Sequence, residues 1–347
     1  MKLSNSAKKI LNDPVKIKRR DEWFCRLQDL FNGKYGENVM AIKGLCGYPA
    51  DSTILYTNPE QFVLECLENL AEQVEQYDDE TQFVPPCIEA GMYGVHFIDS
   101  FFGSHVYYKK ETYQWYNERL NSEVGTLQEP DLDKCEIWQI AKRATYAFLK
   151  HEVALPIFGL STIASTLNIA VNLYGEDILE SMLMETEKAA HDFAVINNLL
   201  VDLHRWYRSV LPERQLQPVI SWERTQPFGY GQICGCTTQL ISADVYKSQI
   251  APLDNELLGV YPNGGMMHLC GSHSHFMPVF RSMPNLKAIQ LNDRAAHDLE
   301  LYFTGLRGDQ IIYLYPCEGM TVDMAMQITG GKRLVLVDRI NTPIALK

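Results

Sequence analysis

The sequence lacks the features that assign a chain at once to a membrane or nucleotide-binding class. It contains no run of 18 uninterrupted apolar residues, so no membrane-spanning helix is expected. The opening stretch MKLSNSAKKILNDPVKIKRRDEW is basic but has no apolar core of the kind found in a secretory signal. Neither a GxGxxG after a predicted strand nor a GxxxxGKS or GxxxxGKT motif occurs, so nothing supports a nucleotide-binding fold.

Positive charge is in short supply. The 347 residues include 31 Lys and Arg against 43 Asp and Glu, a formal net charge of −12. Binding to phosphate backbones requires a basic surface, so a nucleic-acid partner is not expected. The same balance disfavours binding to an anionic membrane surface.

A disulfide framework is also missing. The nine cysteines are an odd number and are scattered along a long chain. This distribution is typical of reduced thiols in a cytoplasmic protein, some of which can bind a metal or react. We therefore expect a cytoplasmic location.

The order of predicted elements changes near residue 80. Residues 1–80 have apolar residues at helical spacing, and Asn58-Pro59-Glu60 is a helix-start signal, so we predict an N-terminal helical cap. From about residue 82, predicted strands alternate with helices. Residues 81–347 are therefore expected to form a (β/α)8 barrel of parallel strands, which together with the cap is one structural unit. A doubly wound open sheet is the alternative.

Individual elements follow from the same patterns. Helices are expected over 137–151, over 162–174 and, as one long helix, over 178–211. Strands are expected at the following positions: 219–221, 266–269, 286–291, 310–315 and 333–337.

The stretch GGMMHLCGS, residues 264–272, carries the clearest chemistry. If 266–269 ends a strand, then His268 and Cys270 are two residues apart and point to the same face. An imidazole and a thiolate on one face, followed by a glycine that permits a turn, make half of a zinc site. The alternative is a half-buried histidine beside a core cysteine.

Other polar residues follow the predicted strands. In a barrel, active residues lie where strands end, which selects Glu223 and Asp293 as catalytic candidates and Cys317 as the third metal ligand. The fourth position could be open to water or substrate, or be filled by Glu223, Cys234 or Cys236. The residues predicted to line a substrate pocket are Tyr230, Cys234, Cys236, His273 and His275.

Several stretches resemble one superfamily. GGMMHLCGS followed by LKAIQLND, the loop GCTTQLISADVYKSQIAPLDNEL, and FVPPCIEAGMYGVHFIDSFFGSHVYY are similar to segments of the uroporphyrinogen decarboxylase-like superfamily, over roughly residues 80–340. That superfamily includes cobalamin-dependent methyltransferases. Ala243 stands where those proteins usually have a proline, and the interval to Cys317 is shorter than usual.

The resemblance implies a function and a ligand set. In the zinc methyltransferases an H-x-C pair and a later cysteine bind zinc, and these positions match His268, Cys270 and Cys317. The expected function is zinc-dependent methyl transfer between a small-molecule methyl donor or acceptor and cobalamin carried by a separate corrinoid protein. Residues 1–60 lack the arginine-rich motif of the porphyrinogen decarboxylases, which counts against that reaction.

Two other classes of function remain open. One is a metal-free lyase acting on a small carboxylate, which Arg224, Arg294 and Arg339 could hold. The other is a non-catalytic barrel subunit of a larger assembly. A homodimer is compatible with each of these functions.

Overall fold

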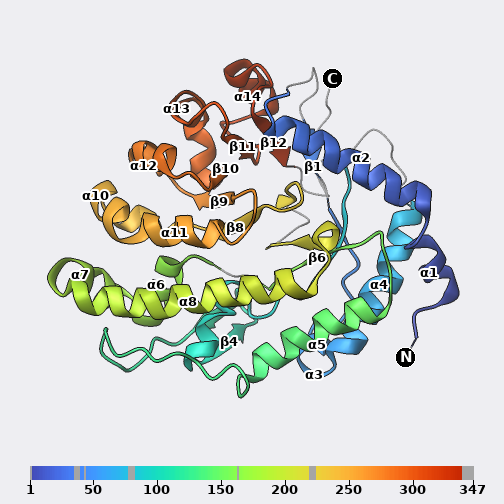
Figure 1. Ribbon diagram of the computed structural model, residues 1–347, viewed down its shortest axis with the longest axis horizontal. Coiled ribbons are helices and arrows are strands. Elements are labelled where there is room, and N and C mark those ends of the chain that lie inside the picture. The colour runs from blue at the N-terminus through green and yellow to red at the C-terminus, as the bar shows by residue number, and fades with distance from the viewer. Residues whose placement is uncertain are drawn as a thin grey trace.

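The protein is built on parallel strands in two sheets (Figure 1). The computed structural model describes residues 2–34, 40–42, 44–76, 83–161, 164–218 and 224–337. A six-stranded sheet has the order β1-β12-β11-β10-β9-β8, and a four-stranded sheet has the order β2-β3-β6-β7. The strands are β1 Met40–Ile42, β2 Leu45–Cys46, β3 Pro86–Glu89, β6 Ile157–Gly159, β7 Leu216–Gln217, β8 Gly231–Cys234, β9 Gly265–Cys270, β10 Leu286–Asn292, β11 Ile311–Leu314 and β12 Leu334–Val337, with an antiparallel pair β4 Val106–Lys109 and β5 Gln114–Asn117.

Every pairing within the two large sheets is parallel, which confirms the predicted α/β class. Helices cover the strands because parallel neighbours need a crossover connection. The helices are α1 Asn5–Ile10, α2 Pro14–Phe31, α3 Ile54–Thr57, α4 Pro59–Gln76, α5 Glu136–Lys150, α6 Thr166–Tyr174, α7 Glu176–Met184, α8 Thr186–Val210, α10 Ala243–Val245, α11 Ala251–Leu258, α12 Met277–Ser282, α13 Leu299–Gly305 and α14 Val322–Thr329. Short 3₁₀ or π turns connect them: η1 Gly94–His96, η2 Asp99–Phe102, η3 Glu213–Gln215, η4 Cys236–Leu240, η5 Tyr246–Ile250, η6 Ser274–Phe276 and η7 Asp293–Asp298.

The strands bury both faces, and alternate residues enter different cores. Met267, Ile289 and Ile312 join the core that the strands form with the surrounding helices. Met266, Ala288 and their neighbours enter a second apolar cluster, to which both sheets contribute: Ile42, Cys87, Ile157, Ile311, Tyr313, Val335 and Val337. The two sheets therefore enclose a common interior.

A parallel bridge between Ile42 and Phe83 links the two sheets at β1 and the residues just before β3. The first 80 residues thus contribute strands as well as helices, since β1 pairs with β12 and β2 pairs with β3.

Helix α2 closes one end of this interior. Its Phe24 ring lies 4.0 Å from the ring of Phe228 and 5.1 Å from that of Phe83, residues that precede β8 and β3. The neighbouring Phe31 packs against Tyr230, whose hydroxyl accepts a hydrogen bond from Gln28 at 3.1 Å. These contacts place α2 at the amino ends of the strands. The helix therefore does not cover their carboxyl ends.

Most predicted elements are present, with one difference in extent. Asn58 caps α4 through its side chain, as its sequence signal predicts. The single helix expected over 178–211 is instead two, because Glu185 leaves helical geometry at φ −136° and α8 starts after it. The predicted strand 219–221 and Arg339, a candidate carboxylate-binding residue, lie outside the described residues. In the part of the chain that the structure describes, no helix combines the length and apolar character needed to cross a bilayer.

Candidate metal centre

Strand β9 carries His268 and Cys270 on one face, as predicted. Its neighbour β10 sets the register, with His268 opposite Gln290 and Cys270 opposite Asn292. Gly271 follows at φ +84°, a conformation that favours glycine, and turns the chain immediately after Cys270. The pair therefore lies at the carboxyl end of its strand, which is the end opposite α2.

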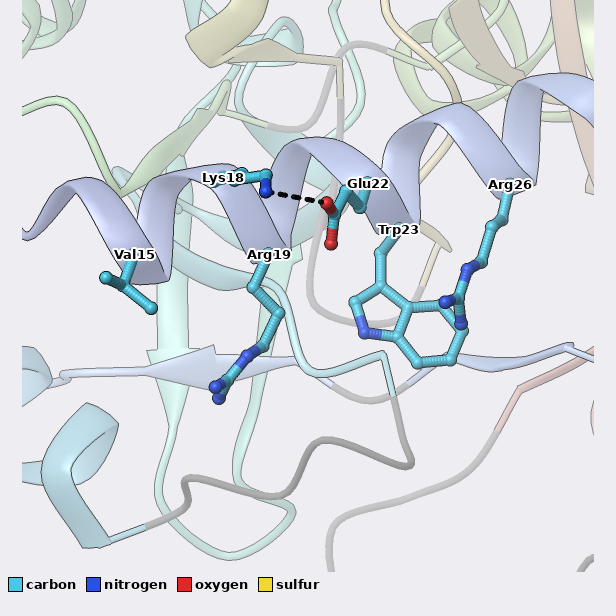
Figure 2. Close-up of a pocket in the computed structure, with 6 residues that line it drawn as sticks. All are labelled: Val15, Lys18, Arg19, Glu22, Trp23 and Arg26. Carbon is cyan, nitrogen blue, oxygen red and sulfur yellow. Dashed lines mark ion pairs between the residues drawn. The ribbon is translucent and has the colours of Figure 1, made fainter.

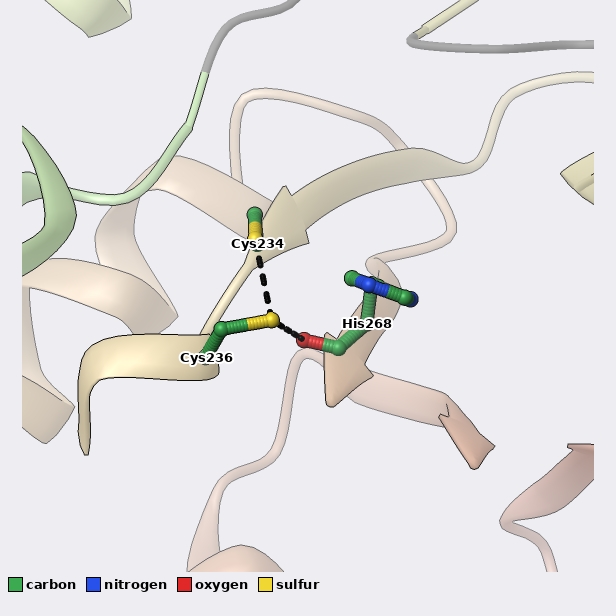
Figure 3. A group of neighbouring side chains, drawn as sticks. All are labelled: Cys234, Cys236 and His268. Carbon is green, nitrogen blue, oxygen red and sulfur yellow. Dashed lines mark hydrogen bonds between the residues drawn. The ribbon is translucent and has the colours of Figure 1, made fainter. Parts of the chain in front are cut away.

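Cys234 and Cys236 come to the same place from β8. Cys234 is the register partner of His268, and its Sγ lies 3.5 Å from that of Cys236 (Figure 3). Gly235 lies between these two cysteines. A Cβ at that position would lie 2.7 Å from Met267 Sδ, so glycine is the residue that fits without a shift of the Met267 side chain. The ligand atoms of Cys234, Cys236 and His268 all lie within 4.8 Å of one another. Cys270 is outside this set of three, but its Sγ lies 3.1 Å from His268 Nε2, and we refer to the four residues together as the Cys/His group.

The imidazole of His268 is oriented for ligation. Its Nδ1 lies 2.7 Å from Gln290 Oε1, and a carbonyl oxygen can only accept, so Nδ1 carries the proton. The lone pair is then on Nε2, which lies 3.1 Å from Cys270 Sγ. A second-sphere acceptor of this kind is the usual partner of a metal-binding histidine.

The spacing of the donors suits zinc. Two thiolates at the usual Zn–S distance of about 2.3 Å and at a tetrahedral angle have sulfurs about 3.8 Å apart. The separation of 3.5 Å between Cys234 and Cys236 is close to that value. Sulfur and imidazole donors favour zinc over magnesium or calcium, which prefer oxygen.

The thiols interact strongly with one another. Interaction with the neighbouring Cys236 holds the pKa of Cys234 and that of Cys270 below the ordinary range. The same interactions raise the pKa of Cys236, since its deprotonation would add a further negative charge. A bound divalent cation would remove this penalty by compensating all the thiolates, so the group fits a metal ion.

Two asparagines contact the group from other elements. Asn168 of α6 has its Nδ2 3.4 Å from Cys234 Sγ. Asn292 has its Nδ2 3.6 Å from Cys270 Sγ and 3.3 Å from an oxygen of Asp293. Asp293, a predicted catalytic residue, is exposed at the end of β10 and thus borders the Cys/His group.

Two other predicted residues, Cys317 and Tyr230, are not part of the Cys/His group. The thiol of Cys317, the expected third ligand, is 3.7 Å from His297 Nε2, and Cys317 is not a member of the metal-binding group found among the described residues. Tyr230 lies at the amino end of β8, in the packing under α2. Glu223 is outside the described residues.

The two histidines predicted to line a substrate pocket, His273 and His275, lie in different surroundings. His273 is fully buried and bonds the Gly271 carbonyl through Nδ1, and burial lowers the pKa of its ring. His275 is exposed, with its ring 3.9 Å from that of Phe276. His273 therefore supports the turn after β9, whereas His275 faces outward.

Sequence reasoning missed the residues that surround the Cys/His group. Gln290 is an amide within the apolar strand LKAIQLN, and such an amide is itself a signal, because a buried polar side chain needs a partner. Asn168 carries no comparable signal, since its role depends on how α6 packs against β8.

A pocket apart from the Cys/His group lies on the outer side of α2 (Figure 2). Its described lining is Val15, Lys18, Arg19, Glu22, Trp23 and Arg26. Lys18 pairs with Glu22 at 3.6 Å, and the Arg26 guanidinium lies 4.5 Å from the centre of the Trp23 ring. These side chains largely satisfy one another and form the solvated face of a helix.

The fold and the site together define a mixed α/β protein of parallel strands with a sulfur and imidazole group at strand ends. No protein-family model matches the sequence, and no curated protein sequence matches it. Among solved structures, the chain is similar to a methyltransferase from Methanosarcina mazei, with a TM-score of 0.62. The match covers 90% of this chain and 91% of that one at 9% identity, so it shows a shared fold.

Proposed function

We propose that this protein is a zinc-dependent methyltransferase that works with a corrinoid protein. The observation that carries the proposal is the Cys/His group, whose donors come from β8, β9 and the start of η4 and match the chemistry of zinc. The likeness in fold to a methyltransferase supports the reaction class.

We infer further that the parallel strands form a closed (β/α)8 barrel. The interior shared by both sheets, the bridge between Ile42 and Phe83, and the helix that covers one end are all consistent with closure. In such a barrel the reactive groups belong at the carboxyl ends of the strands, which is where His268 and Cys270 lie.

Cys234, Cys236, His268 and Cys270 would hold the ion. When bound, zinc would act as a Lewis acid that lowers the pKa of a substrate thiol or polarises a methylated heteroatom.

The reaction balances without a further oxidant or reductant. A thiol R–SH and a methyl-cobalt(III) corrinoid give the thioether R–S–CH3, a cobalt(I) corrinoid and a proton. Asp293 can take that proton toward solvent, because it is exposed beside Asn292, which contacts Cys270. His268 keeps its own proton on Nδ1 through Gln290, so its Nε2 stays available as a ligand.

A spectroscopic assay tests the function. Purified zinc-loaded protein is mixed with methylcobalamin and a thiol, and separately with cobalt(I) cobalamin and methylamines, methanol or aryl methyl ethers. We expect the visible spectrum to report interconversion of methyl-cobalt(III) and cobalt(I) in one of these mixtures. Unchanged spectra in all of them, with zinc present, would contradict the proposal.

A further inference from the structure

Buried polar atoms that have no partner among the described residues lie in the interior next to the Cys/His group. They are both amide atoms of Gln232, Arg224 Nε and Gln290 Nε2. Gln232 is 1% exposed, Gln290 0% and Arg224 9%. Buried polar groups are nearly always hydrogen-bonded, so these unpaired atoms near one site need an explanation.

The topology brings these residues to the inner side of the Cys/His group. Gln232 shares a strand face with Cys234, two residues away, and Gln290 already bonds His268 through its other amide atom. The segment that carries Arg224 is fixed nearby, since Thr225 O accepts a hydrogen bond from Tyr313 and Gln226 bonds the carbonyl of Gly231. Tyr313 is the register partner of Gln290.

Arg224 brings a positive charge into the interior, since it is only 9% exposed. Its Nε has no hydrogen-bond partner among the described residues. Burial of an unpaired cation costs free energy, which an anion with fitting hydrogen-bond acceptors would recover.

We propose that Arg224, Gln232 and Gln290 form a subsite for the carboxylate of a small organic acid whose reacting atom lies at the Cys/His group. The guanidinium offers a planar donor edge that matches a carboxylate, and the amide nitrogens of the two glutamines supply further donors. The subsite rests on the proposed function in one respect only. If the protein is a methyltransferase, its methyl donor or acceptor is a small acid whose carboxylate binds at this subsite.

Binding measurements test the subsite separately from the methyl transfer. The probes are propionate and 3-mercaptopropionate, with propionamide and 3-mercaptopropionamide as uncharged counterparts, titrated calorimetrically into zinc-loaded and metal-free protein. Propionate is expected to bind both forms and propionamide neither. The thiol of 3-mercaptopropionate is expected to strengthen binding only when zinc is present. If propionate binds but the thiol adds nothing, the subsite stands and the proposed function fails.

Three variants complete the test. Arg224→Gln should weaken propionate binding about tenfold or more, because a charge-assisted pair is lost. Arg205→Gln, an exposed arginine paired with Asp202, is the matched control and should leave binding unchanged. Gln232→Leu should weaken binding several-fold and raise the melting temperature, since it replaces an unpartnered buried amide with an apolar group. If Arg224→Gln does not fold, propionate binding by Gln232→Leu is the measurement that tests the subsite. Equal binding of propionate and propionamide, or unchanged binding in folded Arg224→Gln or in Gln232→Leu, overturns the proposal.

Discussion

His268 Nδ1 donates a hydrogen bond to Gln290 Oε1 across two neighbouring parallel strands, at 2.7 Å. The two residues are register partners, so the sheet itself sets their separation. Because this bond determines which nitrogen of the ring is free, β10 controls the chemistry of a residue on β9. The Cys/His group thus depends on the pairing of strands as well as on its own four side chains.

Replacing Gln290 tests this control directly. Gln290→Leu leaves His268 Nδ1 without its acceptor, so we expect zinc affinity to fall about 10- to 100-fold with the fold preserved. Gln290→Glu retains an acceptor oxygen and is the matched control, which should keep most of the affinity. Competition with a chromophoric chelator measures both variants. If Gln290→Leu and the wild type bind zinc with equal affinity, the hydrogen bond between His268 and Gln290 does not contribute to zinc binding.

The ligand set is tested by zinc content. We expect about one zinc per chain in protein purified without chelator, and a large loss in Cys234→Ala, Cys236→Ala, His268→Ala and Cys270→Ala. Cys317→Ala should keep its zinc, because its thiol lies beside His297 and apart from the metal-binding group. Cys25→Ala, at an exposed position, is the control. Loss of zinc in Cys317→Ala together with full content in Cys236→Ala would restore the ligand set expected from sequence.

The sequence predicted that His268 and Cys270 share a strand face because that feature is local, and it offered Cys234 and Cys236 only as alternatives for a fourth ligand. The alternation in GGMMHLCGS places His268 and Cys270 on one face whatever the rest of the chain does. The assignment of Cys317 required knowing how far apart two strand ends lie, which depends on the stagger between strands and on the turn after β11. Neither the stagger nor the turn is encoded in a local pattern. The register of Cys234 with His268 is likewise visible only in the folded sheet.

The N-terminal region shows a similar limit. Helical spacing correctly predicted α4 between residues 59 and 76, since its start signal is within the helix itself. The role of α2 could not be foreseen, because the residues it covers, such as Phe83 and Phe228, are distant in sequence. Its apolar face predicted burial but not against which part of the molecule.

Truncation of Phe24 tests whether α2 is part of the main core. The side chain is 2% exposed and packs on two other phenylalanines, so Phe24→Ala should lower the free energy of unfolding by about 3–5 kcal/mol. Val15→Ala, at an α2 residue that is 64% exposed, should change it by about 0.5 kcal/mol or less. Urea denaturation of the two variants gives both values. A loss for Phe24→Ala as small as that for Val15→Ala would mean that α2 is not needed to close the interior.

Asp254 gives the protein a pH dependence that can be assigned to one residue. Its carboxyl group is fully buried in α11, with one oxygen bonded to the Tyr246 hydroxyl at 2.9 Å and the other without a partner among the described residues. Burial raises the pKa of this carboxyl from the ordinary 3.8 to about 7. Between these two pH values the native state keeps a proton that the unfolded chain has lost.

The sign of the effect follows from that difference in bound protons. Where the native state binds more protons than the unfolded state, stability falls as pH rises, by about 1.4 kcal/mol per pH unit for one group. The contribution of Asp254 should therefore decline between about pH 4 and pH 7 by a total on the order of 4 kcal/mol, and stay level above pH 7. Asp254→Asn is neutral at every pH and keeps an acceptor for Tyr246, so its stability relative to wild type should increase over that interval. Urea denaturation of the pair at pH 4.5, 6 and 8 measures the difference, and a difference that is constant across the three would show that the buried carboxyl has an ordinary pKa.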